Sequence, residues 1–258
     1  MTIDFTAVTS IVSPFSFICA LAFQAFGTQH LVMVTAIGVL CAFICRTVRT
    51  ASDSKRHWLG RFLGLVLLGY VICIYLQQWR SDSLHWGYSL PLDLCDLVLT
   101  ACILSLFRYN QFMTEIAYFW GVGGVVQAIV TPDISQGFPS WNFILFFWGH
   151  GATLIAIAHL VSNRSFRPRR NSILRMMILL NAYGLVVGTI NAIAGWNYGY
   201  LCRKPVNPSL LDYLGPWPWY LLSLELTAFL TFLILDLIWR LLVWFRQPGK
   251  SGTAGFRR

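Results

Sequence analysis

Residues 62–78 read FLGLVLLGYVICIYLQQ and contain no charged side chain. A helix rises about 1.5 Å per residue, so a stretch of this length covers most of the ~30 Å hydrocarbon core of a bilayer. The chain repeats such stretches, and only 11% of its 258 residues are charged, against roughly 25% in soluble domains. This is too little charge to cover a soluble surface. The sequence therefore predicts an all-α fold, a polytopic membrane helix bundle.

Seven apolar stretches are interpreted as membrane spans, the first of them short and the last long, and they use up most of the chain. They are 31–45, 62–78, 89–107, 115–130, 141–162, 173–194 and 219–245. We expect one seven-helix membrane domain over 30–246, preceded by an N-terminal outer interfacial segment (1–29) and followed by a basic cytoplasmic tail (247–258). Residues 11–26 are apolar but short and contain Pro14. If they span, the bundle has eight helices and its N-terminus is cytoplasmic.

Lysine and arginine are distributed unequally over this map, because 16 of the 19 fall on the side that holds the C-terminus. Basic residues concentrate in the cytoplasmic loops of membrane proteins. We therefore expect the N-terminus outside and the C-terminus in the cytoplasm. The same rule accounts for the net charge of +9, so no nucleic-acid partner is expected. The seven cysteines are odd in number and irregularly spaced, which indicates neither a disulfide framework nor a zinc site. We expect no metal and no cofactor.

A few polar side chains interrupt the apolar spans, where an ionisable group costs at least ~2.5 kcal/mol at the helix centre. By helical rise, Cys95 lies about 9 Å and His150 about 14 Å below the outer boundary, so the two can share a pocket. An inert buried thiol and a structural histidine are the simpler interpretations of each residue alone. The supporting candidates are Asp93, Asp96, Asn142, Glu225 and His30, and a polar stripe of the sixth span contains Asn181 and Asn191.

Short motifs follow one another in a fixed order from the third span to the last. They are LPLDLCD at 90–96, YFWG at 118–121 with Gln127 and TPD at 131–133, GHG at 149–151, and an outer loop with Tyr198, Lys204 and GPWPWY at 215–220. These motifs resemble those of the YwaF-like bacterial integral membrane proteins. That family is related to the eukaryotic transmembrane protein 164 group, whose members are implicated as phospholipid acyltransferases that use a membrane-embedded cysteine.

The resemblance implies a transacylase in a bacterial cytoplasmic (inner) membrane, with phospholipid and lysophospholipid as its partners. Cys95 corresponds to the motif cysteine, which would hold the acyl group as a thioester, and His150 to the motif histidine. Asp93 stands where bacterial relatives often have a histidine. Substrate binding is expected at Gln127, Asp133, Asn181, Asn191, Tyr198 and Lys204.

Two other function classes stay open. A transporter or ion-binding protein could use the same histidine and carboxylates, although no inverted repeat is visible. A structural partner of a membrane complex is the third hypothesis. The sequence assigns no oligomeric state.

The distribution of basic residues predicts that the tail after Phe245 lies in the cytoplasm. A fluorescent protein fused after Phe245 should fluoresce, because it folds in the cytoplasm, whereas alkaline phosphatase at the same position should be inactive. Fusions after Lys204, in the expected outer loop, should give the reverse pattern. An exported tail would contradict the predicted orientation.

Overall fold

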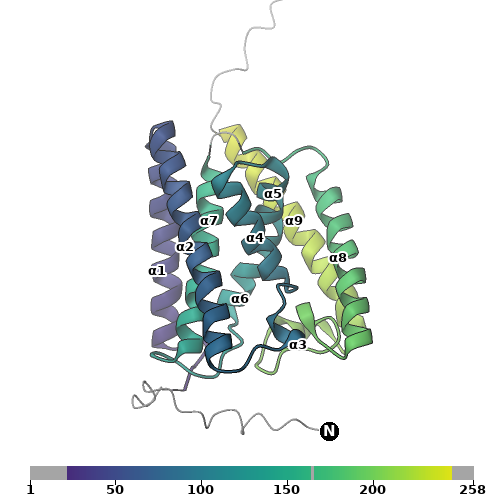
Figure 1. Ribbon diagram of the computed structural model, residues 1–258. Coiled ribbons are helices and arrows are strands. Elements are labelled where there is room, and N and C mark those ends of the chain that lie inside the picture. The colour runs from purple at the N-terminus through teal and green to yellow at the C-terminus, as the bar shows by residue number, and fades with distance from the viewer. Residues whose placement is uncertain (1–21, 164–165, 246–258) are drawn as a thin grey trace, which may run out of the picture.

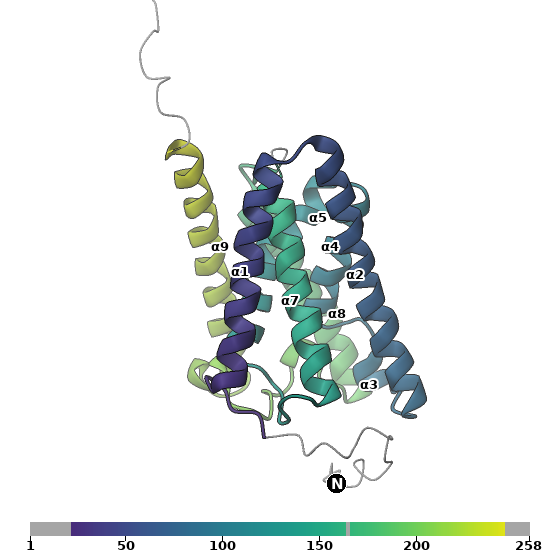
Figure 2. The same cartoon turned by 90° about the vertical axis from the view of Figure 1, so that its left-hand side faces the viewer.

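The structure of the chain, a computed structural model, describes residues 22–163 and 166–245. Within these residues the chain is helical and forms no strand, apart from an isolated bridge between Ala22 and Gln136. Six of its helices are long and apolar enough to cross a membrane, and a shorter apolar helix accompanies them. Figures 1 and 2 show the helices side by side in one bundle. The predicted all-α membrane helix bundle is confirmed.

The helices occupy the predicted stretches, and the first two extend beyond the predicted ends. In chain order the elements are α1 (Thr28–Thr50), α2 (Asp53–Arg80), α3 (Trp86–Ser89), α4 (Leu94–Phe107), α5 (Gln111–Ile116), the π-helix η2 (Ala117–Val125), α6 (Val126–Val130), α7 (Trp141–Ser162), α8 (Ser172–Ala194), the 3₁₀-helices η3 (Tyr198–Tyr200) and η4 (Leu210–Leu214), and α9 (Trp219–Phe245). The tail 247–258 and most of the segments 1–29 and 11–26 lie outside the described residues.

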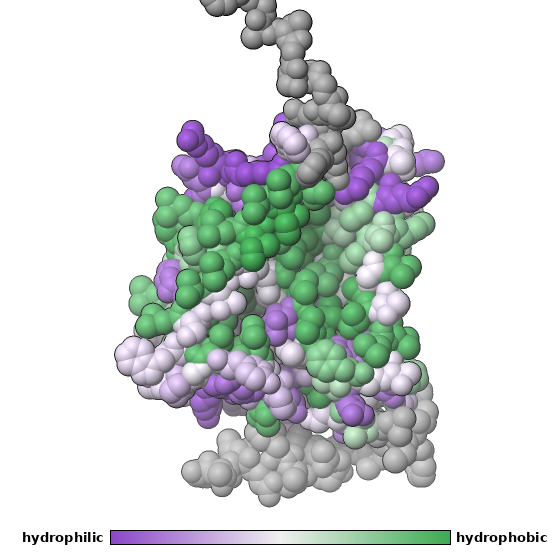
Figure 3. Space-filling view, turned by 180° about the vertical axis from the view of Figure 1, so that it is seen from behind, coloured by the Kyte–Doolittle hydropathy of each residue, from purple (hydrophilic) through white to green (hydrophobic). Residues whose placement is uncertain are grey.

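The middle of the bundle is formed by α7, which packs against α1, α2, α4 and η2. The core side chains that α4, η2 and α7 contribute include Val98, Phe119 and Phe147. The four helices α1, α2, α8 and α9 expose many large apolar side chains. Figure 3 shows the result on one face, a hydrophobic band between two hydrophilic ends. Because such a band suits hydrocarbon rather than water, it is the surface that meets lipid.

The third span differs from the prediction. The sequence predicts an unbroken helix over 89–107, whereas the structure ends α3 at Ser89 and begins α4 at Leu94. Leu90 is extended, with φ −72° and ψ 145°, because a proline disfavours helical conformation in the residue before it, and Pro91 follows. The 14 residues of α4 rise about 21 Å, which is short of the ~30 Å hydrocarbon core. The N-terminal end of α4 therefore lies within the depth of the bundle.

At the end of the bundle that carries most of the basic residues, one carboxylate is fully enclosed. The side chain of Glu115 in α5 is 0% exposed and accepts hydrogen bonds from Arg169 Nη2 at 2.9 Å and Ser172 Oγ at 2.8 Å. Gln111 Nε2 donates at 3.1 Å, and Arg175 Nη2 lies 3.6 Å away. A buried carboxylate needs such partners to offset its lost hydration. The network ties the chain before α8 to α5.

The substitution Glu115→Gln should lower the free energy of unfolding by roughly 2 kcal/mol, because the side chain loses its negative charge and one of the two oxygens that accept from Arg169. Thermal unfolding of the protein in detergent measures the change. The matched control is Asp53→Asn, since Asp53 pairs with Arg56 while its own side chain is 81% exposed, and exposed pairs contribute little. Equal losses in the two variants would contradict the assignment.

Candidate active site at the broken third span

Tyrosine hydroxyls hold the non-helical residues between α3 and α4. Tyr75 of α2 donates to the Ser89 carbonyl at 2.9 Å, and Tyr183 of α8 donates to the Leu92 carbonyl at 2.9 Å. Hydrocarbon supplies no partners for exposed backbone groups, so irregular backbone at membrane depth must be satisfied by protein. Two helices that are distant in sequence therefore stabilise the break.

A third tyrosine fastens the same segment from the outer loop. The Tyr198 hydroxyl donates to the Trp86 carbonyl at 2.6 Å and accepts from the Leu90 N–H at 2.9 Å. The Asn191 side chain at the end of α8 holds the backbone of Tyr198. Its Nδ2 donates to the Tyr198 carbonyl at 2.9 Å, and its Oδ1 accepts from the Tyr198 N–H at 3.0 Å. Both Asn191 and Tyr198 were candidates for substrate binding on sequence grounds. In the structure both are buried, and they position the backbone at the break.

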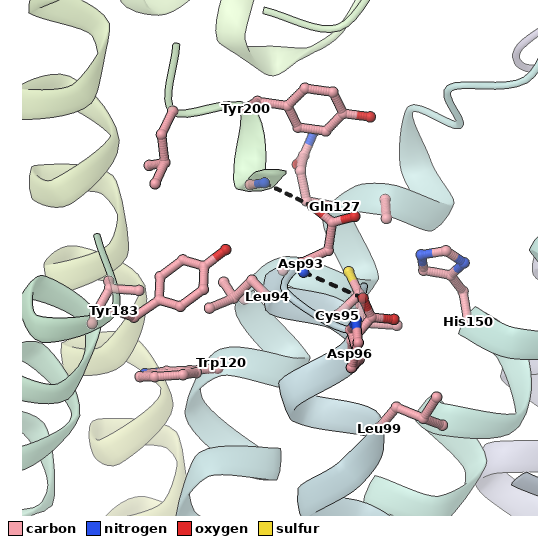
Figure 4. A pocket seen from close by; sticks show the side chains of 18 of the residues that line it. Asp93, Leu94, Cys95, Asp96, Leu99, Trp120, Gln127, His150, Tyr183 and Tyr200 are labelled. Carbon is pink, nitrogen blue, oxygen red and sulfur yellow. Dashed lines mark hydrogen bonds between the residues drawn. The ribbon is translucent and has the colours of Figure 1, made fainter. Parts of the chain in front are cut away.

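The first turn of α4 is capped by two carboxylates. Asp93 is the N-cap residue, and its Oδ1 accepts from the Gly199 N–H at 2.7 Å. Asp96 Oδ2 accepts from the Asp93 N–H at 3.2 Å, and both bonds are drawn in Figure 4. Gly199 has φ +64°, a left-handed conformation that favours glycine. A Cβ there would also lie 2.5 Å from the Tyr183 hydroxyl.

This first turn opens into a cavity of about 1460 Å³, which is lined by α2, α4, η2, α6, α7, α8, α9 and the outer loop. Cys95 and His150 both line it, and Figure 4 shows the Cys95 sulfur and the His150 ring directed into the same space. The N–H groups of Leu94 and Cys95 have no acceptor among the described residues. First-turn N–H groups attract negative charge. A thiol and two free donors thus lie together at one cavity wall.

The His150 ring is oriented by its own helix. Nδ1 lies 2.9 Å from the Phe146 carbonyl, and because a carbonyl only accepts, Nδ1 carries the proton. The Phe146 ring stacks on the imidazole with centroids 4.3 Å apart. The neutral ring then has its lone pair on Nε2, which bonds to no described residue. An imidazole held in this tautomer can accept a proton in the cavity.

The other predicted site residues are divided between the cavity and the rest of the protein. The cavity is lined by Asp93, Asp96, Gln127, Asp133, Asn181 and Glu225. Lys204 Nζ lies 5.7 Å from the centre of the Tyr220 ring, outside this lining. Asn142 is exposed in the first turn of α7. His30 is buried, and its Nε2 lies 2.7 Å from the Ile129 carbonyl, so it joins α1 to α6.

Tyr200 and Asp133 link two outer loops at the end of the cavity. The Tyr200 hydroxyl donates to Asp133 Oδ2 at 2.9 Å, and Asn207 Nδ2 donates to Asp133 Oδ1 at 2.5 Å. Burial, with the Asp133 carboxylate beside it, raises the pKa of Tyr200, so the hydroxyl keeps its proton.

Three tyrosines of the site, Tyr75, Tyr183 and Tyr200, were not among the residues predicted from the sequence. A tyrosine in an apolar span or a loop could have indicated such a role, because a buried tyrosine hydroxyl usually needs a hydrogen-bond partner elsewhere in the protein.

A model of the TMEM164 family matches residues 25–236, which include the whole cavity lining. The chain belongs to the TMEM164 family. The match confirms the resemblance to the transmembrane protein 164 group and, with the apolar helices, identifies an integral membrane protein. No curated protein and no solved structure matches the chain.

In this TMEM164-family chain, Tyr198→Phe should loosen the break, because it removes the two hydrogen bonds to Trp86 and Leu90. We expect a loss of roughly 2 kcal/mol in the free energy of unfolding, about 1 kcal/mol for each bond. Tyr88→Phe is the control, since the Tyr88 hydroxyl donates to Ser83 at an exposed position. Thermal unfolding in detergent compares the two, and an equal effect would contradict the role of Tyr198.

Proposed function

We propose that this chain is a phospholipid acyltransferase, a transacylase that carries the acyl group as a thioester on Cys95 with His150 as the general base. One observation carries the proposal. The Cys95 thiol lies in the first turn of α4, beside two N–H groups without acceptors, and shares its cavity with an imidazole whose Nε2 is free. A nucleophile, a base and oxyanion donors are the parts that acyl transfer requires.

The first half-reaction forms the thioester. His150 Nε2 takes the thiol proton, and the sulfur attacks the carbonyl carbon of a phospholipid ester. The carbonyl oxygen becomes negative and is met by the N–H groups of Leu94 and Cys95. The ester C–O bond then breaks, and the leaving alkoxide takes the proton from His150. A lysophospholipid is released, and the acyl group remains on Cys95.

The second half-reaction reverses these roles. The hydroxyl of a second lysophospholipid gives its proton to His150 and attacks the thioester carbonyl. The C–S bond breaks, and the sulfur recovers the proton from His150. Phospholipid and free thiol are restored, so each cycle moves one acyl chain without net consumption of water or cofactor.

The shape and lining of the cavity support a lipid substrate. Its volume of about 1460 Å³ exceeds the ~300–1,000 Å³ of ordinary small-molecule pockets. Apolar side chains from α2, α8 and α9 form much of its wall, including Ile74, Leu185 and Leu224. The acyl chains of a phospholipid ester would pack against these apolar side chains. We place the reaction in a bacterial cytoplasmic membrane, with the basic end of the bundle inside.

By the resemblance, bacterial relatives often have a histidine where this chain has Asp93, and an aspartate there is compatible with this proposal. The Asp93 carboxylate caps α4 and accepts from the Gly199 N–H at 2.7 Å. Its work in the proposed reaction is to hold the first turn, which needs an acceptor and no base. Proton transfer is left to His150.

A second function is favoured by the charge of the cavity. Asp93, Asp96, Asp133 and Glu225 line it, and no lysine or arginine of the described residues does. Such a lining would suit a transported cation or proton. Against a bound metal, the described residues contain no cluster of three His, Cys, Asp or Glu side chains that could hold one.

The purified protein in liposomes with isotope-labelled phospholipid should form an acyl adduct on Cys95 that hydroxylamine removes, and should pass the label to lysophospholipid. Cys95→Ala should abolish both, and His150→Ala should slow both by roughly 10²–10⁴-fold, the usual contribution of a general base. Mass spectrometry follows the adduct and the lipids.

The control is Cys102→Ala, which removes a fully buried thiol of the same helix that does not line the cavity and should leave the adduct in place. Transfer that persists at an unchanged rate in Cys95→Ala would refute the nucleophile. Ion flux without any lipid change would favour the transporter.

A further inference from the structure

The cavity is lined by several tyrosines, and one of them differs from the rest. The hydroxyls of Tyr75, Tyr88, Tyr183 and Tyr200 donate to Ser89, Ser83, Leu92 and Asp133. Tyr70 of α2 also lines the cavity, yet its hydroxyl bonds to no described residue. The oxygen is not among the fully enclosed polar atoms without a partner either. Tyrosine hydroxyls in buried positions usually have a partner, and this one is free to bind a ligand.

The Tyr70 ring is fixed in place by the helix that carries His150. It lies against Gly149, where a Cβ would overlap the ring and lie 2.7 Å from the hydroxyl oxygen. The Trp148 ring packs edge-on against it with centroids 5.9 Å apart. Only glycine at 149 permits this approach, so the motif GHG places the Tyr70 hydroxyl beside the residue that precedes His150. A donor held this way needs no reorganisation when charge develops.

Tyr70 also shares a cavity with the proposed nucleophile. Cys95 and Asp96, in the first turn of α4, line that cavity together with Tyr70. The free donor therefore reaches this cavity from α2, the thiol from α4 and the imidazole from α7.

We propose that Tyr70 is a further catalytic residue, whose hydroxyl donates a hydrogen bond to the ester oxygen that becomes negative when Cys95 attacks. The inference rests on the proposed acyl transfer and adds a side-chain donor to the N–H groups of Leu94 and Cys95. The phenol keeps its proton throughout, and no bond of Tyr70 forms or breaks. The same hydrogen bond acts again when a lysophospholipid hydroxyl attacks the thioester.

The test is Tyr70→Phe in the full chain, reconstituted in phospholipid vesicles. The ring that packs on Gly149 is retained, and the hydroxyl has no protein partner to lose, so the fold is kept. Thioester formation on Cys95 should slow by about 10²-fold, the usual effect of removing one oxyanion donor. Alkylation of Cys95 by iodoacetamide should keep its rate, because displacement of iodide creates no oxyanion.

The matched control is Tyr118→Phe, whose hydroxyl donates to the Leu235 carbonyl at 2.9 Å and which does not line the cavity. It should transfer acyl groups at the rate of the unaltered chain. Unchanged thioester formation in Tyr70→Phe would overturn the inference, and so would slowed alkylation, since the hydroxyl would then act on the thiol. No adduct on the unaltered chain would instead refute the proposed function, and this inference with it.

Discussion

Backbone groups inside hydrocarbon must find their hydrogen-bond partners within the protein. The structure of the candidate site depends on how the chain meets this requirement at the break in its third span. The third span is interrupted at residues 90–93. Tyr75, Tyr183 and Tyr198 supply the partners that lipid cannot. Without these hydroxyls, the carbonyl groups of Trp86, Ser89 and Leu92 would lose these partners, which makes a helix end inside the bundle costly.

The interruption has a chemical consequence. A helix that starts within the membrane presents first-turn N–H groups in surroundings of low dielectric, where their attraction for negative charge is stronger than in water. Cys95 is placed in that turn, and His150 meets the same cavity from the central helix α7. The fold therefore brings a thiol, an imidazole and unpaired N–H donors to one cavity by ending a single helix early.

The hydrophobicity of the sequence was enough to predict most of the membrane-spanning helices, because each span must be apolar whatever helices it packs against. The broken span was missed, although its signals were in the sequence: Pro91 disfavours helix before it, and Asp93 is a good N-cap residue. The site was harder, since one sequence does not fix how each helix is rotated. Asn191 was therefore counted as a binding residue, when it holds the backbone of Tyr198. Tyr70 could not be found at all, because its contact with Gly149 joins helices far apart in sequence.

The first turn of α4 combines opposing electrostatic influences on Cys95. The helix N-terminus favours an anion there, whereas Asp93 and Asp96 on either side of the thiol disfavour a second negative charge. In the proposed reaction, the resting sulfur therefore keeps its proton until a substrate ester is in place. Negative charge then passes quickly from sulfur to the carbonyl oxygen, where the N–H groups of Leu94 and Cys95 receive it. Such an arrangement stabilises the charge of the transition state more than that of the resting enzyme, and only that difference accelerates a reaction.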